Sequence, residues 1–428
     1  MATFFPIAGN RTKKFAGVLL LIFLAQCVWL TRAELRSGFG CYPSGTMERQ
    51  SRVMEGLAQW RGQRVAGTPG SGPPLDTSPG GSSSLQTSRG YDPYRSPVWY
   101  LVAAAPVAFG PSPMDPAREK LWLWLTRLPY LIFGVLLGAS LWYVTRRLYG
   151  NPGGVIALVL YCFSPGIIQS SSEVCRDSES GAAWGAFGAV FTAIALAHTL
   201  YAPREVVLWN WRRITLLAIS LALAIGSQFS LIVLAPVTLG FLLYLAPQRR
   251  VAATMIWAAA CAGAAVLFAA GYFFHFEILW RGLHAAKWVD VAPAALRMSE
   301  NYRGAASHIV HGSPLLIVLL PVAFFGYTAC RRARYFGNTA PLLMVALCLG
   351  LGLAAPDFPG QGFLLVAMPF LFAFVAGVFA DLLETRSGSY SGGSGSGDSY
   401  SGGLWLRILL TGALAGYALW SLVALAQV

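Results

Sequence analysis

The residues best placed to do chemistry form a short acidic segment that follows two strongly apolar stretches. Glu173, Arg176, Asp177 and Glu179 stand close together where the second apolar stretch ends. At a membrane surface, a carboxylate can take the proton of an acceptor hydroxyl, and a guanidinium can neutralise a lipid phosphate. The segment is therefore a candidate active or binding site. The alternative is a structural ion-pair cluster at a helix end, because Glu173 and Asp177 would share a helix face.

The two apolar stretches that deliver this segment are predicted to be membrane-spanning helices. Each is long enough to cross a bilayer, and the polar residues between them are of the types found in tight turns. The second helix would then bring the acidic segment to the far side of the membrane. The turn contains Arg146, Arg147, Gly150, Asn151 and Pro152.

The composition places the whole chain in the class of multi-pass membrane proteins. Of its 428 residues, 56% are hydrophobic and only 11% are charged, which is more apolar surface than one soluble core could bury. The formal net charge of +13 would suggest nucleic acid in a soluble protein. Here most Lys and Arg residues lie in short loops beside apolar runs, so they indicate topology and contact with anionic lipid instead.

The fold class predicted is an all-α membrane domain with about eleven spans and a large first extracytoplasmic loop. Within that loop, 31–120, the apolar run Pro97 to Phe109 is too short to span. It is predicted to lie in the membrane interface with Trp99 and Tyr100 at headgroup level. The other spans are expected over 15–30, 181–201, 214–226, 229–245, 251–274, 314–330, 341–355, 363–383 and 404–426.

The distribution of basic residues predicts the orientation. Counted from a cytoplasmic N-terminus, each cluster of Arg residues between spans falls on the inside, as the positive-inside rule requires. A transmembrane domain over 1–383 is expected to be followed by a Ser/Gly-rich cytoplasmic linker over 384–403 and a last transmembrane helix over 404–428. The predicted location is the cytoplasmic membrane.

An ordered series of motifs resembles the GT-C superfamily of membrane glycosyltransferases, in the branch of the protein O-mannosyltransferases and aminoarabinose transferases. The resemblance covers about the first 250 residues and rests on the order and spacing of its pieces. The pieces are Met47-Glu48-Arg49 with Val53 to Leu57 and Trp60, Ser96 to Tyr100, Arg127-Leu128-Pro129, Thr145 to Gly150, Ser164-Pro165 and Arg176-Asp177.

The resemblance implies transfer of a sugar from a polyprenyl-phosphate donor to a lipid, glycan or protein acceptor outside the cytoplasmic membrane. By its match to the family's acidic motif, Glu48 is the candidate base, and Asp177 matches the second acidic residue. Glu34 is a further candidate, because the register of the first loop is open. Without the resemblance, a loop carboxylate such as Glu48 would be read as solvated.

Donor binding requires positive charge beside the lipid phosphate. The candidate substrate-binding residues are Arg127, Glu173, Arg176, Arg281 and Lys287, although the residue type and position of Arg127 favour an interfacial anchor over a phosphate ligand. Three positions depart from the family pattern: Met47 replaces the usual Asp of the acidic pair, Gln228 stands where a Lys is common, and Gln361 lies in a turn that lacks the usual Arg-Tyr pair.

No cofactor is expected beyond the lipid-linked sugar substrate. His308 and His311 invite a metal interpretation, but polar loop histidines are the simpler reading. A disulfide between Cys41 and Cys175 is an open alternative, and the other five Cys residues are expected to pack in spans. Two rival functions remain: a GT-C-like scaffold or assembly factor without activity, which the three departures favour, and a transporter, which would carry ionisable residues at mid-membrane.

Overall fold

A computed structural model describes residues 10–37, 94–108, 119–172, 179–201, 211–289, 291–330, 333–355, 362–385 and 399–427. Every regular element in these ranges is a helix, as predicted. The bundle begins with α1 (Asn10–Ser37), whose Phe23 and Cys27 are fully buried. Polar side chains also join α1 to the bundle, since Thr31 donates to the carbonyl of Ser172 (2.9 Å). The first apolar run is therefore an integral helix of this fold.

The helix α4 (Glu119–Cys162) is two antiparallel helices joined by a sharp turn at Gly150. Gly150 has φ +75°, a left-handed conformation that glycine adopts without a steric penalty. The hydroxyl of Tyr161 donates to the carbonyl of Gly134 (2.5 Å). These residues would lie roughly 40 Å apart on one straight helix, so the chain must fold back. The predicted pair of spans with a tight turn is confirmed.

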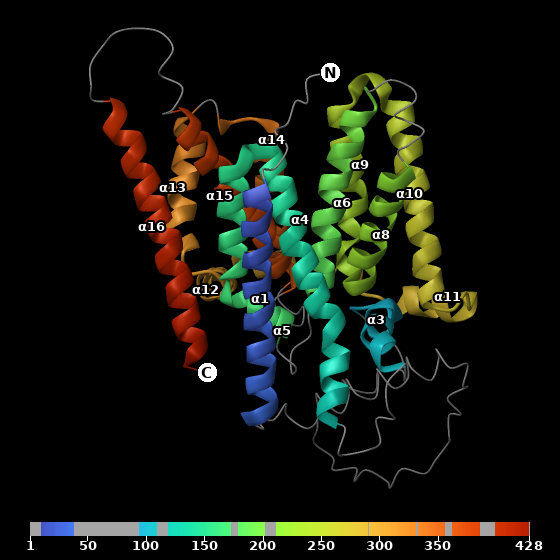
Figure 1. Cartoon of the computed structure of the whole chain (residues 1–428). Coiled ribbons are helices and arrows are strands. Elements are labelled where there is room, and N and C mark those ends of the chain that lie inside the picture. Colours follow the sequence, from blue (N-terminus) through green and yellow to red (C-terminus); the bar gives the residue numbers. More distant parts are fainter. Residues whose placement is uncertain are drawn as a thin grey trace.

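The following helices run alternately up and down between two ends of the bundle (Figure 1). α1 starts towards the upper end, where the turn of α4 also lies, whereas α16 ends at the lower end. Among the described residues of the predicted cytoplasmic Arg clusters, those of the α4 turn and of the starts of α8 and α10 lie at the upper end. The spanning and central helices after α4 are α5 (Pro165–Ser172), α6 (Ser180–Thr199), α8 (Trp211–Ser227), η2 (Phe229–Val233) with α9 (Leu234–Leu245), η3 (Pro247–Arg249) with α10 (Arg250–Gly271), α13 (Leu316–Ala329), α14 (Phe336–Ala354), α15 (Gly362–Thr385) and α16 (Ser399–Ala426).

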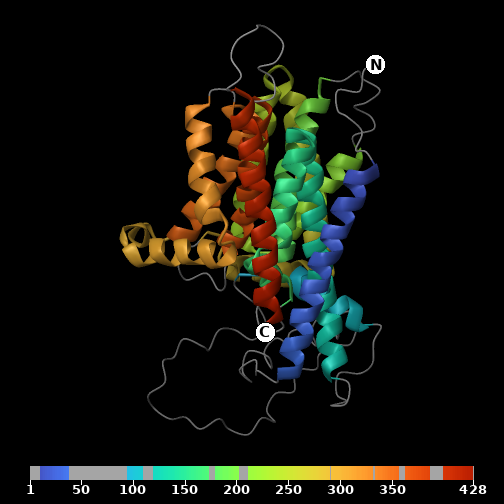
Figure 2. The same ribbon diagram turned by 60° about the vertical axis from the view of Figure 1, so that its left-hand side comes forward.

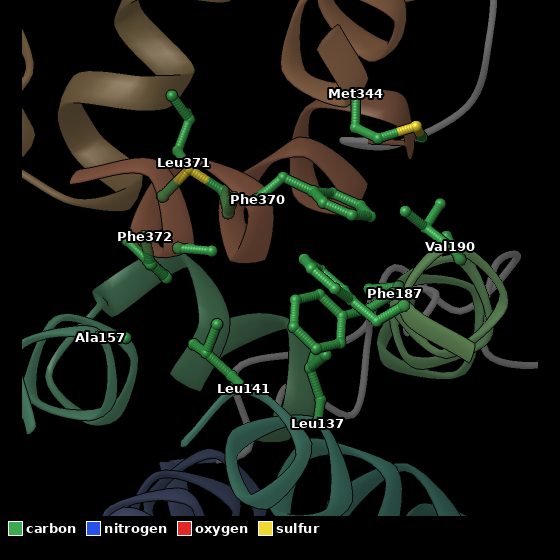
Figure 3. Close-up of a cluster of buried hydrophobic side chains, with 14 of the residues drawn as sticks. Leu137, Leu141, Ala157, Phe187, Val190, Met344, Phe370, Leu371 and Phe372 are labelled. Atoms are coloured by element: carbon green, nitrogen blue, oxygen red, sulfur yellow. The ribbon is translucent and has the colours of Figure 1, made fainter. Parts of the chain in front are cut away.

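The core is built around α15 and α6, the two most deeply buried of the long helices. The ring of Phe187 in α6 lies 5.5 Å from that of Phe370 in α15 and 4.6 Å from that of Phe191. Leu137 and Leu141 approach the same cluster from the first half of α4, and Met344 approaches it from α14 (Figure 3). Interdigitating aromatic and aliphatic side chains thus hold four helices together.

Small residues allow α6 to pack directly on the backbone of α8. A Cβ atom added at Gly185 would lie 2.6 Å from the backbone nitrogen of Ala224, and one at Gly188 would lie 2.6 Å from the hydroxyl of Ser220. Close approach of backbones over Gly and Ala is the usual way in which helices pack inside membranes. The composition of α6 therefore determines how closely α8 can approach.

Among the described residues, seven helices are long and apolar enough to cross a membrane, or up to eight if α12 (Ser299–Gly312) and α13 form one broken span. The sequence predicted about eleven membrane spans. The α4 hairpin counts once in the smaller number although it contains two predicted spans. The predicted spans at α8 and at η2 with α9 are 17 residues each or shorter. The short α13 accounts for the remaining difference, because it meets α12 at 105°.

Three further helices lie across the lower end of the bundle (Figures 1 and 2): α3 (Pro97–Ala108), α11 (Phe276–Ala285) and α12, with η4 (Pro293–Arg297) preceding α12. The short helix predicted near residue 97 is confirmed. The predicted headgroup depth of Trp99 and Tyr100 stays a prediction, but Trp99 is buried inside the protein. Its indole packs on Tyr130 of α4, which removes it from the surface.

The bend between α12 and α13 is held from both sides. The hydroxyl of Ser164 donates to the carbonyl of Gly312 (2.6 Å), and a Cβ at Gly166 would lie only 2.8 Å from the Cα of Gly312. On the other side, the hydroxyls of Ser313 and Tyr417 are 3.1 Å apart. Through Tyr417, the helix α16 is thus attached to the lower end of the bundle. The helix α16 begins at Ser399, within the stretch that was predicted to be a linker.

Candidate functional site

The predicted carboxylates fall largely outside the described residues. Glu48, Glu173, Arg176 and Asp177 lie outside these ranges, and Glu34 belongs to the end of α1 without a described side chain. The segment of Glu173, Arg176 and Asp177 follows α5, which ends at the lower end of the bundle (Figure 1). These residues remain predictions. What the structure describes at this end is the surrounding set of buried polar side chains.

Arg127 is the predicted substrate-binding residue that the structure places most clearly. It lies near the lower end of the first α4 helix, and its side chain is only 4% exposed. The Nη2 group donates to the carbonyl of Ser170 in α5 (3.3 Å), and the guanidinium lies 5.6 Å from the ring centroid of Tyr130. An interfacial anchor would extend towards the headgroups. The alternative reading of Arg127 as such an anchor is therefore wrong.

A second buried arginine, Arg95, was missed in the sequence. It is 6% exposed, and its guanidinium lies 5.0 Å from the ring of Trp99. The chain on either side of it is bonded to the turn after α8. Ser96 donates to the carbonyl of Gly226 through both its amide and its hydroxyl (2.9 Å each), and the amide of Phe229 donates to the carbonyl of Tyr94 (3.0 Å). These bonds fix the position of Arg95.

Two glycines allow α3 to dock at this place. A Cβ atom at Gly271 would lie 2.3 Å from Cγ2 of Val98, and one at Gly226 would lie 3.3 Å from Cβ of Val98. Any larger residue at Gly271 would push α3 away from the ends of α8 and α10. The sequence contains both glycines, but only the fold shows that they meet the same valine.

Arg95, Trp99, Tyr130 and Arg127 form one continuous stack, which we call the Arg–aromatic ladder. The ring centroids of Trp99 and Tyr130 are 5.4 Å apart. The guanidinium of Arg95 lies over the ring of Trp99, and that of Arg127 lies over the ring of Tyr130. The hydroxyl of Tyr130 also donates to the carbonyl of Trp99 (3.1 Å). Cation–π contacts stabilise guanidinium groups at sites where water is excluded. The ladder therefore holds two positive charges inside the lower end of the bundle.

A buried carboxyl group accompanies the ladder. Glu179 precedes α6 and is 5% exposed, and the adjacent Ser180 donates through its hydroxyl to the carbonyl of Tyr130 (3.1 Å). This bond ties the start of α6 to the ladder. Glu179 belongs to the acidic segment recognised in the sequence, and through Ser180 this described end of the segment is attached to Tyr130, the residue that Arg127 lies over. The structure therefore brings together two parts of the chain that the sequence analysis had singled out separately.

The two remaining predicted cations have different partners. Lys287 follows α11, and its Nζ atom is 5.4 Å from the ring centroid of Tyr94, next to Arg95. Arg281 is exposed on α11 and pairs with Glu277 one turn earlier. Lys287 thus lies beside the ladder. No contact joins Arg281 to the ladder among the interactions of the described residues.

Gln228 occupies the turn in which the resemblance would place a lysine. Its side chain is fully enclosed, and Nε2 donates to the hydroxyl of Ser230 (3.0 Å). Its Oε1 atom is buried and accepts no hydrogen bond from the described residues. The turn lies between Gly226 and Phe229, both bonded to the chain around Arg95. The amide therefore lies at the same end of the bundle as the ladder, with one free acceptor. Met47 and Gln361 lie outside the described residues.

The described part of the chain contains no group of three or more His, Cys, Asp or Glu residues that could hold a metal ion. The interpretation of His308 and His311 as loop histidines is wrong, because both residues lie on the helix α12. The Nδ1 atom of His311 lies 2.7 Å from the carbonyl of Ser307. Cys27, Cys162 and Cys348 are buried and Cys261 and Cys330 are partly buried, as expected for packing residues, whereas Cys41 and Cys175 lie outside the described ranges.

The apolar helices define an all-α multi-pass membrane protein. No protein-family model matches the sequence, and no curated protein matches it. A solved structure with the same fold is the archaeal oligosaccharyltransferase AglB from Archaeoglobus fulgidus, in complex with an inhibitory peptide and a dolichol-phosphate. AglB is a GT-C membrane glycosyltransferase. The TM-score is 0.52 at 14% identity.

The alignment with AglB covers 96% of this chain and 56% of that protein. This chain therefore spans little more than half the length of AglB. The likeness confirms the fold that the ordered motifs predicted, including the part of the chain beyond the first 250 residues. Activity and ligands are separate questions, because one fold can carry several functions.

Proposed function

We propose that this protein is a glycosyltransferase that moves a sugar from a polyprenyl-phosphate donor to an acceptor at the lower end of the bundle. The observation that carries the proposal is the Arg–aromatic ladder. Two guanidinium groups enclosed at the end of a bundle of apolar helices suit a phosphate whose lipid tail remains in the membrane. Guanidinium groups form strong, often bidentate hydrogen bonds with phosphate oxygens, so the ladder supplies donors of the type that a lipid phosphate would use.

In the proposed reaction, a carboxylate takes the proton of an acceptor hydroxyl. The hydroxyl oxygen attacks the anomeric carbon of the donor sugar, and the bond from that carbon to the phosphate oxygen breaks. Polyprenyl phosphate leaves with the electron pair. Arg127 and Arg95 would stabilise the negative charge on the leaving phosphate. Glu48 and Asp177 remain the proposed base and second acidic residue, with Glu34 as a further candidate.

The remaining predicted ligands take supporting roles. Glu173 and Arg176 stand in the segment between α5 and Glu179, and we propose that they contact the sugar or acceptor. Lys287, beside Tyr94, adds a third cation near the ladder. Arg281 is exposed on α11, and we propose that it meets the lipid phosphate before the donor enters the site. The proposed acceptor is a lipid, a glycan or a protein.

We also propose that the upper end is cytoplasmic and that the protein belongs to the cytoplasmic membrane. Arg146, Arg212, Arg249 and Arg334 all belong to turns or helix starts at the upper end, as the positive-inside rule requires. This orientation can be tested in intact cells by introducing one cysteine at a time into a variant whose native cysteines are replaced, and by measuring whether a membrane-impermeant thiol reagent labels it. A cysteine at Arg146 should react only after permeabilisation, and labelling of intact cells at that position would reverse the orientation.

The function is tested by sugar transfer from a panel of polyprenyl-phosphate sugars with purified protein in lipid vesicles. Glu48→Gln and Asp177→Asn should each reduce turnover by about a hundredfold or more if they act on the transferred proton. Arg146→Gln, at the upper end, is the control and should leave turnover unchanged. Unchanged turnover in both acidic variants would discard these two residues as catalytic groups.

The scaffold alternative has one observation in its favour, because Gln228 carries no charge where the resemblance places a lysine. Isothermal titration of the protein with polyprenyl phosphate separates the two functions. Binding that needs Arg127 but gives no transfer from any donor would indicate a lipid-binding scaffold. Failure to bind polyprenyl phosphate at all would overturn the proposal for the ladder.

A further inference from the structure

The turn after α10 has an unusual backbone and an unusual surface. Phe273 and Phe274 have φ values of +52° and +56°, a left-handed conformation that bulky residues rarely adopt. The turn closes against the end of α10, since the amides of Phe273 and Phe274 donate to the carbonyls of Ala270 (2.9 Å) and Ala269 (3.0 Å). Two adjacent strained residues persist only where the surrounding structure compensates their cost.

The side chains that follow the turn form an exposed aromatic surface. Phe273, Phe274, Phe276 and Trp280, which we call the aromatic elbow, are 37%, 54%, 71% and 65% exposed. Phe276 and Trp280 are four residues apart and share one face of α11. Large apolar side chains gathered on one surface mark an interaction site, because water is a poor environment for them.

One side of α11 is firmly attached to the protein. Leu279 and Leu283 pack against the buried cluster of Phe229, Phe268 and Tyr272. A Cβ at Gly282 would lie 2.8 Å from the hydroxyl oxygen of Tyr272, so α11 rests directly on that ring. The helix is therefore held in place, and Phe276 and Trp280 remain exposed at the edge of its attached side.

The position of α10 identifies what covers this surface. The span Pro247–Gly271 has 25 residues and a high mean hydropathy, and its Val266 and Leu267 are exposed just before the turn. A helix of this length is about 37 Å long, somewhat more than the roughly 30 Å of bilayer hydrocarbon. Its end must therefore lie at the boundary between hydrocarbon and headgroups. The elbow continues the lipid-facing surface of α10 at this depth.

We propose that the aromatic elbow inserts into the headgroup boundary of the bilayer leaflet at the lower end and anchors α11 there. Trp and Phe side chains are favourable at this depth, and Arg281 and Lys287 follow at the level of the lipid phosphates. The anchor reaches the ladder through Lys287, which lies over Tyr94 beside Arg95. The proposal depends on the membrane location and not on the transfer reaction.

The test uses the full chain in single-copy nanodiscs of phosphatidylethanolamine and phosphatidylglycerol. The variant Phe276→Cys carries a bimane dye, and the unsubstituted protein, treated in the same way, corrects for its native cysteines. Phospholipids with a nitroxide near the headgroup should quench the dye strongly. Iodide in the water should quench it about threefold less than it quenches the free dye, since one side of an interfacial residue faces lipid.

A second pair of variants makes the test independent of the substitution at Phe276. Trp280→Phe should remove part of the tryptophan emission that brominated phospholipids quench. The matched control Trp288→Phe should leave that part unchanged, because the Trp288 ring packs on Phe229 (5.2 Å) and its Nε1 donates to the carbonyl of Leu283 (3.0 Å). Full iodide quenching at position 276 with no lipid quenching, or equal losses in the two Trp variants, would overturn the proposal and leave the elbow as a surface for another protein.

Discussion

The two ends of the bundle use the same residue types in opposite environments. At the lower end, Arg95 lies over Trp99 at 5.0 Å, and both side chains are buried. At the upper end, Arg212 lies over Trp211 at 5.7 Å, and Trp211 is 59% exposed. The chemistry of the two contacts is the same. They differ in whether water can solvate the guanidinium.

The difference separates cations that set topology from cations that suit a ligand. Arg146 and Arg147 at the upper end are solvated and bond within their own turn, to the side chains of Asn151 and Tyr143 (2.9 Å each). They cost little to maintain and need no further partner. Burial of Arg95 and Arg127 is costly in free energy, and a phosphate in the site would offset part of that cost.

The largest expected effect is on donor binding at the lower end. Arg127→Gln should lower kcat/KM for the lipid-linked donor by about a hundredfold, because it removes a positive group from the leaving phosphate. Arg127→Lys should recover part of the loss, since the charge returns without the bidentate geometry. Arg146→Gln is the matched control. Equal activity of Arg127→Gln and Arg146→Gln would erase the distinction between the two ends.

Removal of the tryptophan that an arginine lies over should reduce the stability of the protein more at the lower end than at the upper end. Trp99→Ala should lower the free energy of unfolding by about 3–5 kcal/mol, because it leaves a cavity between Arg95 and Tyr130. Trp211→Ala should change it by less than about 1 kcal/mol, since the exposed contact buries little surface. Thermal unfolding in one detergent measures both. Similar melting temperatures for the two variants would show that the ladder is not a packed unit.

A smaller effect is expected from two tyrosine hydroxyls. Tyr130→Phe removes the bond to the carbonyl of Trp99, and Tyr149→Phe removes a bond to the carbonyl of Gly337 near the upper end (2.6 Å). Each should cost about 1 kcal/mol of stability. Only Tyr130→Phe should raise the KM for the donor, because only Tyr130 supports Arg127. A donor KM that rises equally in both variants would point to a general loss of structure.

The smallest effect should come from the exposed basic turn. Arg147→Gln breaks the bond to Tyr143, but both side chains are exposed, so the stability change should stay within about 0.5 kcal/mol. Unfolding in the same detergent measures this change. A loss as large as that of Trp99→Ala would mean that the upper cations also have a structural task.

The predictions from sequence succeeded where one local property was enough. The helix predicted from Pro97 to Phe109 is Pro97–Ala108, and the hairpin with its turn near Gly150 is present. Arg127 was found because it opens a motif. Arg95 was missed because it follows a Gly- and Ser-rich stretch that reads as a linker. Its position directly before Ser96-Pro97, four residues from Trp99, was the available signal.

Other features depended on partners that are distant in the chain. Trp99 was expected at headgroup level, as its place in a short apolar helix suggests, yet it is buried and packs on Tyr130 of α4. The number of spans was less certain than their positions, because a break such as the 105° bend at Gly312 depends on Ser164 and Tyr417. Neither contact is visible as a local pattern.

By itself, the sequence determined the membrane class, the order of the apolar helices and the end at which the basic turns gather. These follow from hydropathy and charge over short windows, because bilayer partitioning acts on each segment separately. The tertiary structure alone decided which charges are buried and which side chains stack on them. The ladder joins Arg95 to Arg127 through rings on two helices, and the chain can bring them together only after α3 has docked against Gly226 and Gly271.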